Sequence, residues 1–191
     1  MKLILGSSSP FRKQLLQQLN LKFETQSPDI DETPLEGESI EDMVLRLSVE
    51  KALEIAKNHS DALIIGSDQS AILNGEVLQK PGNHENATKQ LKNASGQSIV
   101  FQTGLCLLNS STGKIQSKLV PYTVVFRQLS DEMIEKYLQA EQPYNCAGSF
   151  KSEGLGIALF EKMEGTDPSA LIGLPLIELT NMLKNENFPV L

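Results

Sequence analysis

The sequence predicts an α/β protein with a mixed β-sheet flanked by helices. Short apolar runs typical of buried strands alternate with segments in which apolar residues recur at helical spacing. Two pairs of strand-like runs are joined by short turns, one at Asn74-Gly75 and one within residues 109–114, and such turns connect antiparallel strands. Alternating elements favour parallel strands and hairpins are antiparallel, so the sheet is predicted to contain both.

The N-terminal half is predicted to alternate between strands and helices. A strand over residues 2–5 is followed by a helix over residues 11–19, because Ser9 suits the N-cap and Pro10 suits the first helical position. The elements expected next are a strand over 22–27, a long helix that begins after Ser39, and a buried strand over 63–67.

The C-terminal half continues in the same manner. Its expected elements are a helix over 83–94, two long strands over 99–108 and 118–127, a helix from Ser130 to Gln139, and a last helix over 175–183. Internal repeats, low-complexity tracts and linkers are lacking, so we expect a single domain over residues 1–191.

Composition limits the functions that this chain can have. The formal net charge of −7 argues against a nucleic-acid-binding protein, whose surface would be basic. The apolar runs are too short to span a membrane, and Met1-Lys2 leads straight into a strand, so we expect a cytoplasmic protein. Two cysteines without metal-ligand spacing predict buried thiols, and two histidines leave little material for a histidine-based site. Carboxylates and lysines must therefore carry any chemistry.

Asp68 is the first candidate functional residue. It follows the apolar run Leu63-Ile64-Ile65, so we expect it just past the carboxyl end of a core strand, where open α/β sheets form ligand crevices. The alternative is an aspartate that accepts backbone hydrogen bonds in a turn, and this stretch alone favours that alternative.

Two cations stand at unusual places on predicted helices. The segment GSSSPFR, residues 6–12, is a strand, a serine-rich turn and a helix start, an arrangement that binds anions. Arg12 begins the apolar stripe of this helix, and Lys51 lies on the apolar face of the long helix, four residues from both Leu47 and Ile55. Each side chain either extends along the core to reach water or faces a crevice that holds an anion.

Further charged residues fit a phosphate substrate. Glu32, in the acidic stretch DIDE, and Asp68 could bind a hard cation such as Mg²⁺ through oxygen, although acidic loops are usually only solvated. Lys80, in the segment QKPG, is uninformative alone. A P-loop and a GxGxxG fingerprint are both lacking, which removes the two commonest nucleotide-binding folds.

Together, these stretches resemble one known family. The segments LGSSSPFRKQLL, DIDE, LRLSVEKA, IIGSDQ, QKPG, AGSFKSEGLGIALF and GLPLIEL are similar in content and order to the Maf family of nucleotide pyrophosphatases, over essentially the whole chain. The resemblance implies an elongated mixed-sheet fold related to inosine triphosphate pyrophosphatases, with an active site in a cleft between two lobes. It also implies a homodimer, a divalent metal such as Mg²⁺ or Mn²⁺, and hydrolysis of a nucleoside triphosphate between the α and β phosphates.

The resemblance implies roles for individual residues. The implied phosphate-binding residues are Ser8, Arg12, Lys51 and Lys80. Glu32 falls in the acidic motif and is an implied metal ligand, while Asp68 falls at the position of the general base and could also bind the metal. The anion-facing interpretation of Arg12 and Lys51 thereby becomes the favoured one.

Three residues predict which base is accepted. GSDQ and AGSFKSEG are similar to the subgroup that hydrolyses 7-methyl-GTP, although Phe11 stands where that subgroup is expected to carry tryptophan. The carboxylate of Glu153 can accept hydrogen bonds from two adjacent donors of guanine, Phe11 can stack on the cationic methylated ring, and Gln69 can offer an amide to another base edge. The alternatives are a Maf pyrophosphatase for UTP, dTTP or other nucleotides, and a non-enzymatic regulator of septum formation or cell division.

Overall fold

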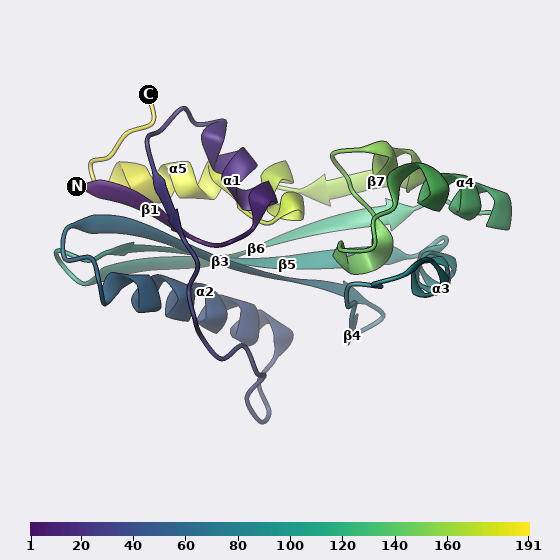
Figure 1. Cartoon of the computed structure of the whole chain (residues 1–191), viewed down its shortest axis with the longest axis horizontal. Helices are drawn as coiled ribbons and strands as arrows, with labels where there is room; N and C mark the ends of the chain where they lie inside the picture. The colour runs from purple at the N-terminus through teal and green to yellow at the C-terminus, as the bar shows by residue number, and fades with distance from the viewer. The chain divides into compact units, whose positions relative to one another are not determined.

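The computed structural model describes all residues, 1–191, and folds them into the α/β arrangement of Figure 1. The strands are β1 (Lys2–Gly6), β2 (Glu24–Gln26), β3 (Ala62–Leu73), β4 (Glu76–Val77), β5 (Ser98–Asn109), β6 (Lys114–Phe126) and β7 (Phe160–Gly165). The helices are α1 (Pro10–Gln17), α2 (Ile40–Ala56), α3 (His84–Ala94), α4 (Asp131–Glu141) and α5 (Leu176–Asn185), with short 3₁₀ turns η1 (Ala147–Ser149), η2 (Leu155–Leu159) and η3 (Pro168–Ile172).

The seven strands form one mixed sheet. Their order is β2-β1-β3-β5-β6-β7, and β4 pairs with β3. Strand β1 runs parallel to both β2 and β3, whereas β3–β4 and β6–β7 are antiparallel. The predicted mixture of parallel and antiparallel strands is therefore confirmed.

The chain divides into two compact units. The first unit contains residues 1–69, 102–120 and 167–191, and the second contains residues 70–101 and 121–166. Strands β3, β5 and β6 each contribute residues to both units. The division into units does not decide whether residues 1–191 form a single domain, so the single domain stays a prediction.

The first unit has an apolar layer on each face of its sheet. Side chains alternate along β1, so Leu3 and Leu5 pack with α1 and α5, while Ile4 packs with α2 on the opposite face (Figure 1). Gly66 permits the approach of α2, because a Cβ atom there would lie 2.0 Å from the Ser48 carbonyl oxygen. The α2 layer also contains Cys106, a buried thiol as predicted, whose pKa burial raises to about 12. Cys146, also predicted to be buried, is partly exposed.

The second unit is centred on aromatic side chains. Phe150 contacts Phe101, Phe126 and Phe160 edge to face, with ring centroids 5.0–5.6 Å apart. Such contacts stabilise beyond the apolar area that they bury, and here they fix the segment between η1 and β7.

Most predicted elements are present, with shifted ends. Ser39 and Ser130 cap α2 and α4, and the Asn74-Gly75 turn joins β3 to β4, all as predicted. The strand predicted over 63–67 is longer, and its polar residues Ser67 and Gln69 find side-chain partners within the folded protein. Strand β7 was not predicted, since all but its first residue are exposed and no apolar alternation marks it. No helix of the protein has the length and apolar content that crossing a membrane requires.

Candidate active site

The turn between β1 and α1 is built by its serines. The hydroxyl of Ser7 accepts a hydrogen bond from the Ser9 amide at 3.1 Å, and the hydroxyl of Ser9 accepts one from the Arg12 amide at 3.3 Å. Ser9 is thus the N-cap and Pro10 the first helical residue, as predicted. Ser8 takes no part in these bonds and is exposed at the start of α1, where a phosphate could reach it.

Arg12 is fixed on the inner side of α1. Its Nε donates to the Gly173 carbonyl oxygen at 2.8 Å, and Gly173 adopts a φ of 117° that favours glycine. Burial lowers the pKa of Arg12, and the negative charges of Asp68 and Glu32 oppose that shift. The charges of both carboxylates thus reach the guanidinium, and the anion-facing interpretation of Arg12 stays a prediction.

Lys51 lies on the buried face of α2 and is only 6% exposed. Its ammonium is 2.6 Å from Asp68 Oδ1 and 2.7 Å from Glu32 Oε1. The alternative in which this ammonium reaches water is therefore wrong. The ammonium donates one hydrogen bond to Asp68 and forms an ion pair with Glu32.

The position of Asp68 differs from the one predicted. It lies within β3 and neither past the end of that strand nor in a turn. The parallel partner β1, however, ends at Gly6 opposite Gly66, so Asp68 comes two residues after β1 stops. Asp68 therefore lies just beyond the carboxyl end of β1. Lys51, on α2, faces Asp68 at this place.

Gln69 is held by the backbone beside it. Its Nε2 lies 2.9 Å from Thr103 Oγ1 and 2.6 Å and 3.2 Å from the carbonyl oxygens of Ala170 and Leu171 in η3. A contact between Gln69 and a base would therefore use Oε1. Phe11, on the first turn of α1, is partly exposed. The roles of Gln69 and Phe11 in base selection stay predictions.

The second unit carries the other two predicted residues. Lys80 is exposed, and its neighbours are held: the Gly82 amide donates to the Tyr144 carbonyl oxygen at 2.9 Å, and Gln90 Nε2 donates to the Gln79 carbonyl oxygen at 2.9 Å. Glu153 is exposed in the turn before η2. The structure thus gathers Arg12, Glu32, Lys51 and Asp68 within the first unit and places Lys80 and Glu153 in the second.

The carboxylates of Glu32 and Asp68 fit a hard divalent cation. Their oxygens already converge on one cation, the ammonium of Lys51. No third carboxylate, histidine or cysteine groups with them. Mg²⁺ is commonly held by one or two carboxylates and completed by water and substrate phosphates, so this donor set suits a metal that arrives with a nucleotide.

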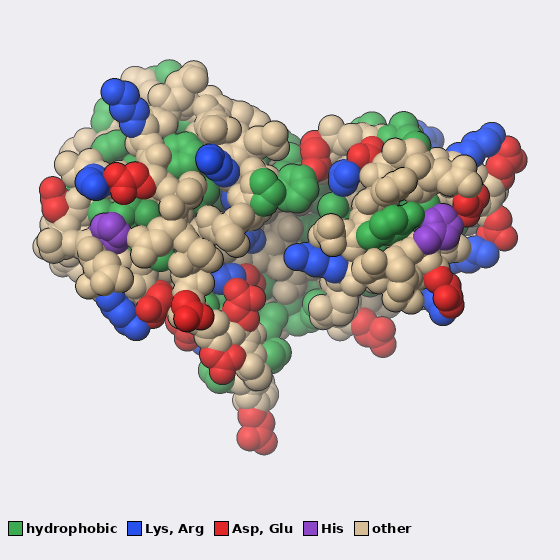
Figure 2. Space-filling model, viewed as in Figure 1, with side chains coloured by type: hydrophobic (Ala, Val, Ile, Leu, Met, Phe, Trp, Pro, Cys, Tyr) green, Lys and Arg blue, Asp and Glu red, His purple; other side chains and the backbone are tan.

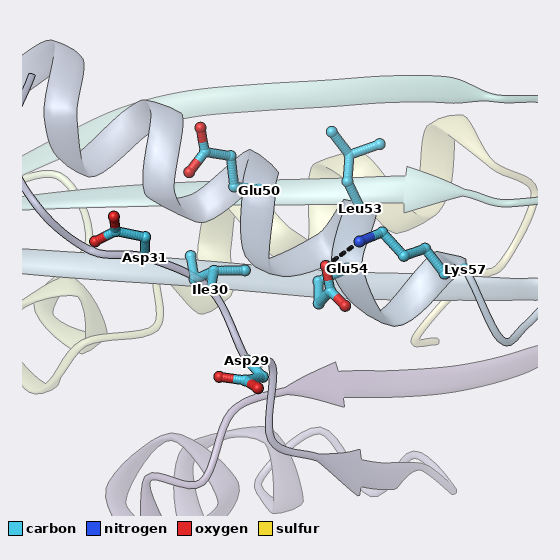
Figure 3. Close-up of a pocket in the computed structure, with 7 residues that line it drawn as sticks. All are labelled: Asp29, Ile30, Asp31, Glu50, Leu53, Glu54 and Lys57. Atoms are coloured by element: carbon cyan, nitrogen blue, oxygen red, sulfur yellow. Dashed lines mark hydrogen bonds and ion pairs between the residues drawn. The ribbon is translucent and has the colours of Figure 1, made fainter.

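A separate depression on the first unit does not suit a triphosphate. It measures about 390 Å³ between α2 and the loop before it, and acidic side chains gather over that loop (Figures 2 and 3). Its lining residues are Asp29, Ile30, Asp31, Glu50, Leu53, Glu54 and Lys57. Four carboxylates and one lysine, itself paired with Glu54, would repel a triphosphate.

The fold and these residues define a candidate phosphate-binding site on a mixed α/β sheet. The chain belongs to the Maf family, since the family profile described as Maf-like protein matches residues 2–186. The family that the sequence motifs predicted is thereby confirmed.

Relatives are similar over nearly the full chain. The 7-methyl-GTP pyrophosphatase of Nitrosococcus oceani is 53% identical over 99% of this chain and 95% of its own length. The proteins of that name from Methylobacillus flagellatus and Alcanivorax borkumensis are 54% and 56% identical, over 99% and 96% of this chain and 98% and 93% of their own lengths. The solved Ham1 protein of Staphylococcus aureus is 15% identical, with a TM-score of 0.46 over 69% of this chain and 73% of that chain.

Proposed function

We propose that this protein hydrolyses 7-methyl-GTP to 7-methyl-GMP and pyrophosphate. The observation that carries the proposal is the buried ammonium of Lys51 between Asp68 and Glu32, in a chain more than half identical to proteins named 7-methyl-GTP pyrophosphatase. Burying a cation between two carboxylates costs solvation energy, which favours a role in binding an anionic substrate over the regulatory alternative.

Charge dictates how the substrate binds. A nucleoside triphosphate carries about four negative charges, so its hydrolysis depends on positioning and neutralisation. Arg12 and Lys51 supply positive charge in the first unit, where Ser8 and the start of α1 add donors. Lys80, which is exposed, is proposed to contribute a further positive charge.

Asp68 is the proposed general base. One of its oxygens is held by Lys51, which leaves the other to orient a water molecule and accept its proton. The oxygen of that water attacks the α-phosphorus, the bond to the β-phosphate oxygen breaks, and pyrophosphate leaves with the electron pair. A divalent metal such as Mg²⁺ or Mn²⁺, when bound to Asp68 and Glu32, makes that water more acidic and offsets phosphate charge.

The base is proposed to be selected by Glu153, Phe11 and Gln69. The carboxylate of Glu153 accepts from the two adjacent donors of guanine, whereas uracil and thymine present acceptor oxygens beside their single N–H. A paired contact of this kind is worth about 1–3 kcal/mol of discrimination. The ring of Phe11 faces the cationic methylated base, which favours it over unmodified guanine by about 0.5–2 kcal/mol.

Pyrophosphate release tests the proposal. Purified protein is supplied with 7-methyl-GTP, GTP, UTP or dTTP, each with Mg²⁺, with Mn²⁺ and with a chelator. We expect the highest kcat/KM for 7-methyl-GTP and loss of turnover in the chelator. Equal kcat/KM for 7-methyl-GTP and UTP would refute the base preference, and no release from any nucleotide would favour the regulatory alternative. We also propose that the protein is a cytoplasmic homodimer and that it does not bind nucleic acid.

A further inference from the structure

The loop that carries Glu153 is fastened to helix α4 at both ends. Tyr137 and Glu141 lie four residues apart on α4 and therefore on one face of the helix. The buried Tyr137 hydroxyl accepts a hydrogen bond from the Lys151 amide at 3.1 Å. Glu141 then makes its own contacts with Lys151 and Leu155, so α4 holds the segment from 151 to 155.

The two carboxylate oxygens of Glu141 bracket Glu153. Oε1 is 3.2 Å from Lys151 Nζ, and Oε2 accepts from the Leu155 amide at 2.9 Å. Lys151 and Leu155 each lie two residues from Glu153, on opposite sides. The hydrogen bond from the Leu155 amide and, to a smaller extent, the contact with the Lys151 ammonium lower the pKa of Glu141. The Glu141 carboxylate therefore stays charged and holds both partners at neutral pH.

Gly154 makes this contact closer than another residue would allow. A Cβ atom at Gly154 would lie 2.8 Å from Glu141 Oε2, inside van der Waals contact. Glu153 itself makes only one side-chain hydrogen bond, at 3.3 Å with the neighbouring Ser152 hydroxyl. The loop therefore carries the Glu153 carboxylate, and Glu141 and Tyr137 together hold the backbone of that loop.

We propose that Glu141 is a positioning residue for base selection, which acts by holding Glu153 where its carboxylate meets the two adjacent donors of guanine. The inference rests on the proposed function and deepens it. Discrimination by paired hydrogen bonds depends on sub-ångström placement, so loosening the loop weakens recognition of guanine and leaves the chemistry at the phosphates unchanged.

The test compares Glu141→Ala and Glu141→Gln with a matched control. Glutamine keeps an acceptor for the Leu155 amide but turns an amide group toward Lys151, so its effect should be the smaller one. Glu132→Gln, on the same helix, removes an exposed ion pair with Lys136 and one negative charge of the first helical turn. The readout is kcat/KM for 7-methyl-GTP divided by kcat/KM for UTP. In Glu141→Ala we expect this ratio to fall about tenfold, through KM for 7-methyl-GTP and at unchanged kcat.

A double-mutant cycle separates positioning from general weakening. In a Glu153→Gln background, Glu141→Ala should leave the already reduced ratio unchanged, because the group that it positions is gone. An additive fall in the double variant, or an equal loss for both nucleotides in the single variant, overturns the inference. Should Glu141→Ala not fold, Glu141→Gln in the same cycle decides.

The outcome also separates this inference from the proposed function. If the unmodified protein does not prefer 7-methyl-GTP, the proposed function is refuted, whatever Glu141 does. If it does prefer 7-methyl-GTP and the ratio survives in Glu141→Ala, only the role of Glu141 is overturned. Faster hydrogen exchange of the Leu155 amide in Glu141→Ala is expected independently of any substrate, because the amide loses its acceptor.

Discussion

Replacing Lys51 by methionine removes the cation between Asp68 and Glu32 and keeps most of the side chain's apolar stem. The Lys51 side chain is 8% exposed and that of Asp68 is 13% exposed, whereas Glu32 is 59% exposed. The variant therefore leaves Glu32 well hydrated and leaves Asp68 as a poorly solvated charge that has lost its hydrogen-bonded cation and keeps only the more distant charge of Arg12. We expect both stability and turnover to fall.

The size of the stability loss follows from this exposure. Removing one partner of a fully buried ion pair costs about 3–5 kcal/mol, because the other charge stays buried. Water reaches part of Asp68, so we expect about 2–3 kcal/mol for Lys51→Met. For a chain of this length that corresponds to a fall of about 4–12 °C in Tm.

Urea unfolding at pH 7 measures this loss, with two comparison variants. Lys57→Met, near the end of the same helix, removes an exposed partner of Glu54 and should cost less than about 0.5 kcal/mol. Lys51→Met combined with Asp68→Asn should be more stable than Lys51→Met alone, because neutral asparagine needs no cation. An unfolding midpoint of Lys51→Met equal to that of Lys57→Met would show that Asp68 is solvated and would refute the reasoning.

Two further predictions concern carboxylates. Asp68→Asn should keep the fold by circular dichroism and lower kcat for pyrophosphate release by about 10²–10⁴-fold, because the proton acceptor is lost; an unaltered kcat would exclude Asp68 as the base. The hydrogen bonds from Arg46 are the main cause that lowers the pKa of Glu38 to about 2. This pair therefore stabilises the fold above pH 4.5 and loses its effect as the pH falls toward 2, so Glu38→Gln should be less stable than the unmodified protein at pH 6 and equally stable near pH 2 in acid unfolding curves.

Sequence patterns predicted the parts of the site that local periodicity encodes. The helical spacing of Leu47, Lys51 and Ile55 placed a lysine on a buried face, and the structure confirms that placement. The serine turn and Pro10 likewise predicted the start of α1, and Arg12 followed on its inner side. Both predictions depend on residues within a few positions of each other, so the sequence contains all that they need.

The contacts that sequence reasoning missed join residues far apart in the chain. The carbonyl of Gly173 holds Arg12 across 161 positions, and no local pattern marks a glycine carbonyl as an acceptor. Glu141 looks like an ordinary acidic residue at the end of a helix, and its role follows only when the loop at 151–155 returns to α4. The extent of β3 was missed because Ser67 and Gln69 find hydrogen-bond partners that only the folded sheet provides.

The charges of the site predict how a divalent metal binds. Arg12 and Lys51 carry two positive charges and Asp68 and Glu32 two negative ones, so the free cluster is balanced. A triphosphate adds about four negative charges and creates the need for a further cation, while its oxygens supply the ligands that two carboxylates cannot. We therefore expect Mn²⁺ to bind weakly to the free protein and at least tenfold more tightly with a non-hydrolysable analogue of 7-methyl-GTP, measured by titration calorimetry. The analogue's own affinity for Mn²⁺ is the control, and equal affinity with and without the analogue would contradict a metal that enters with the substrate.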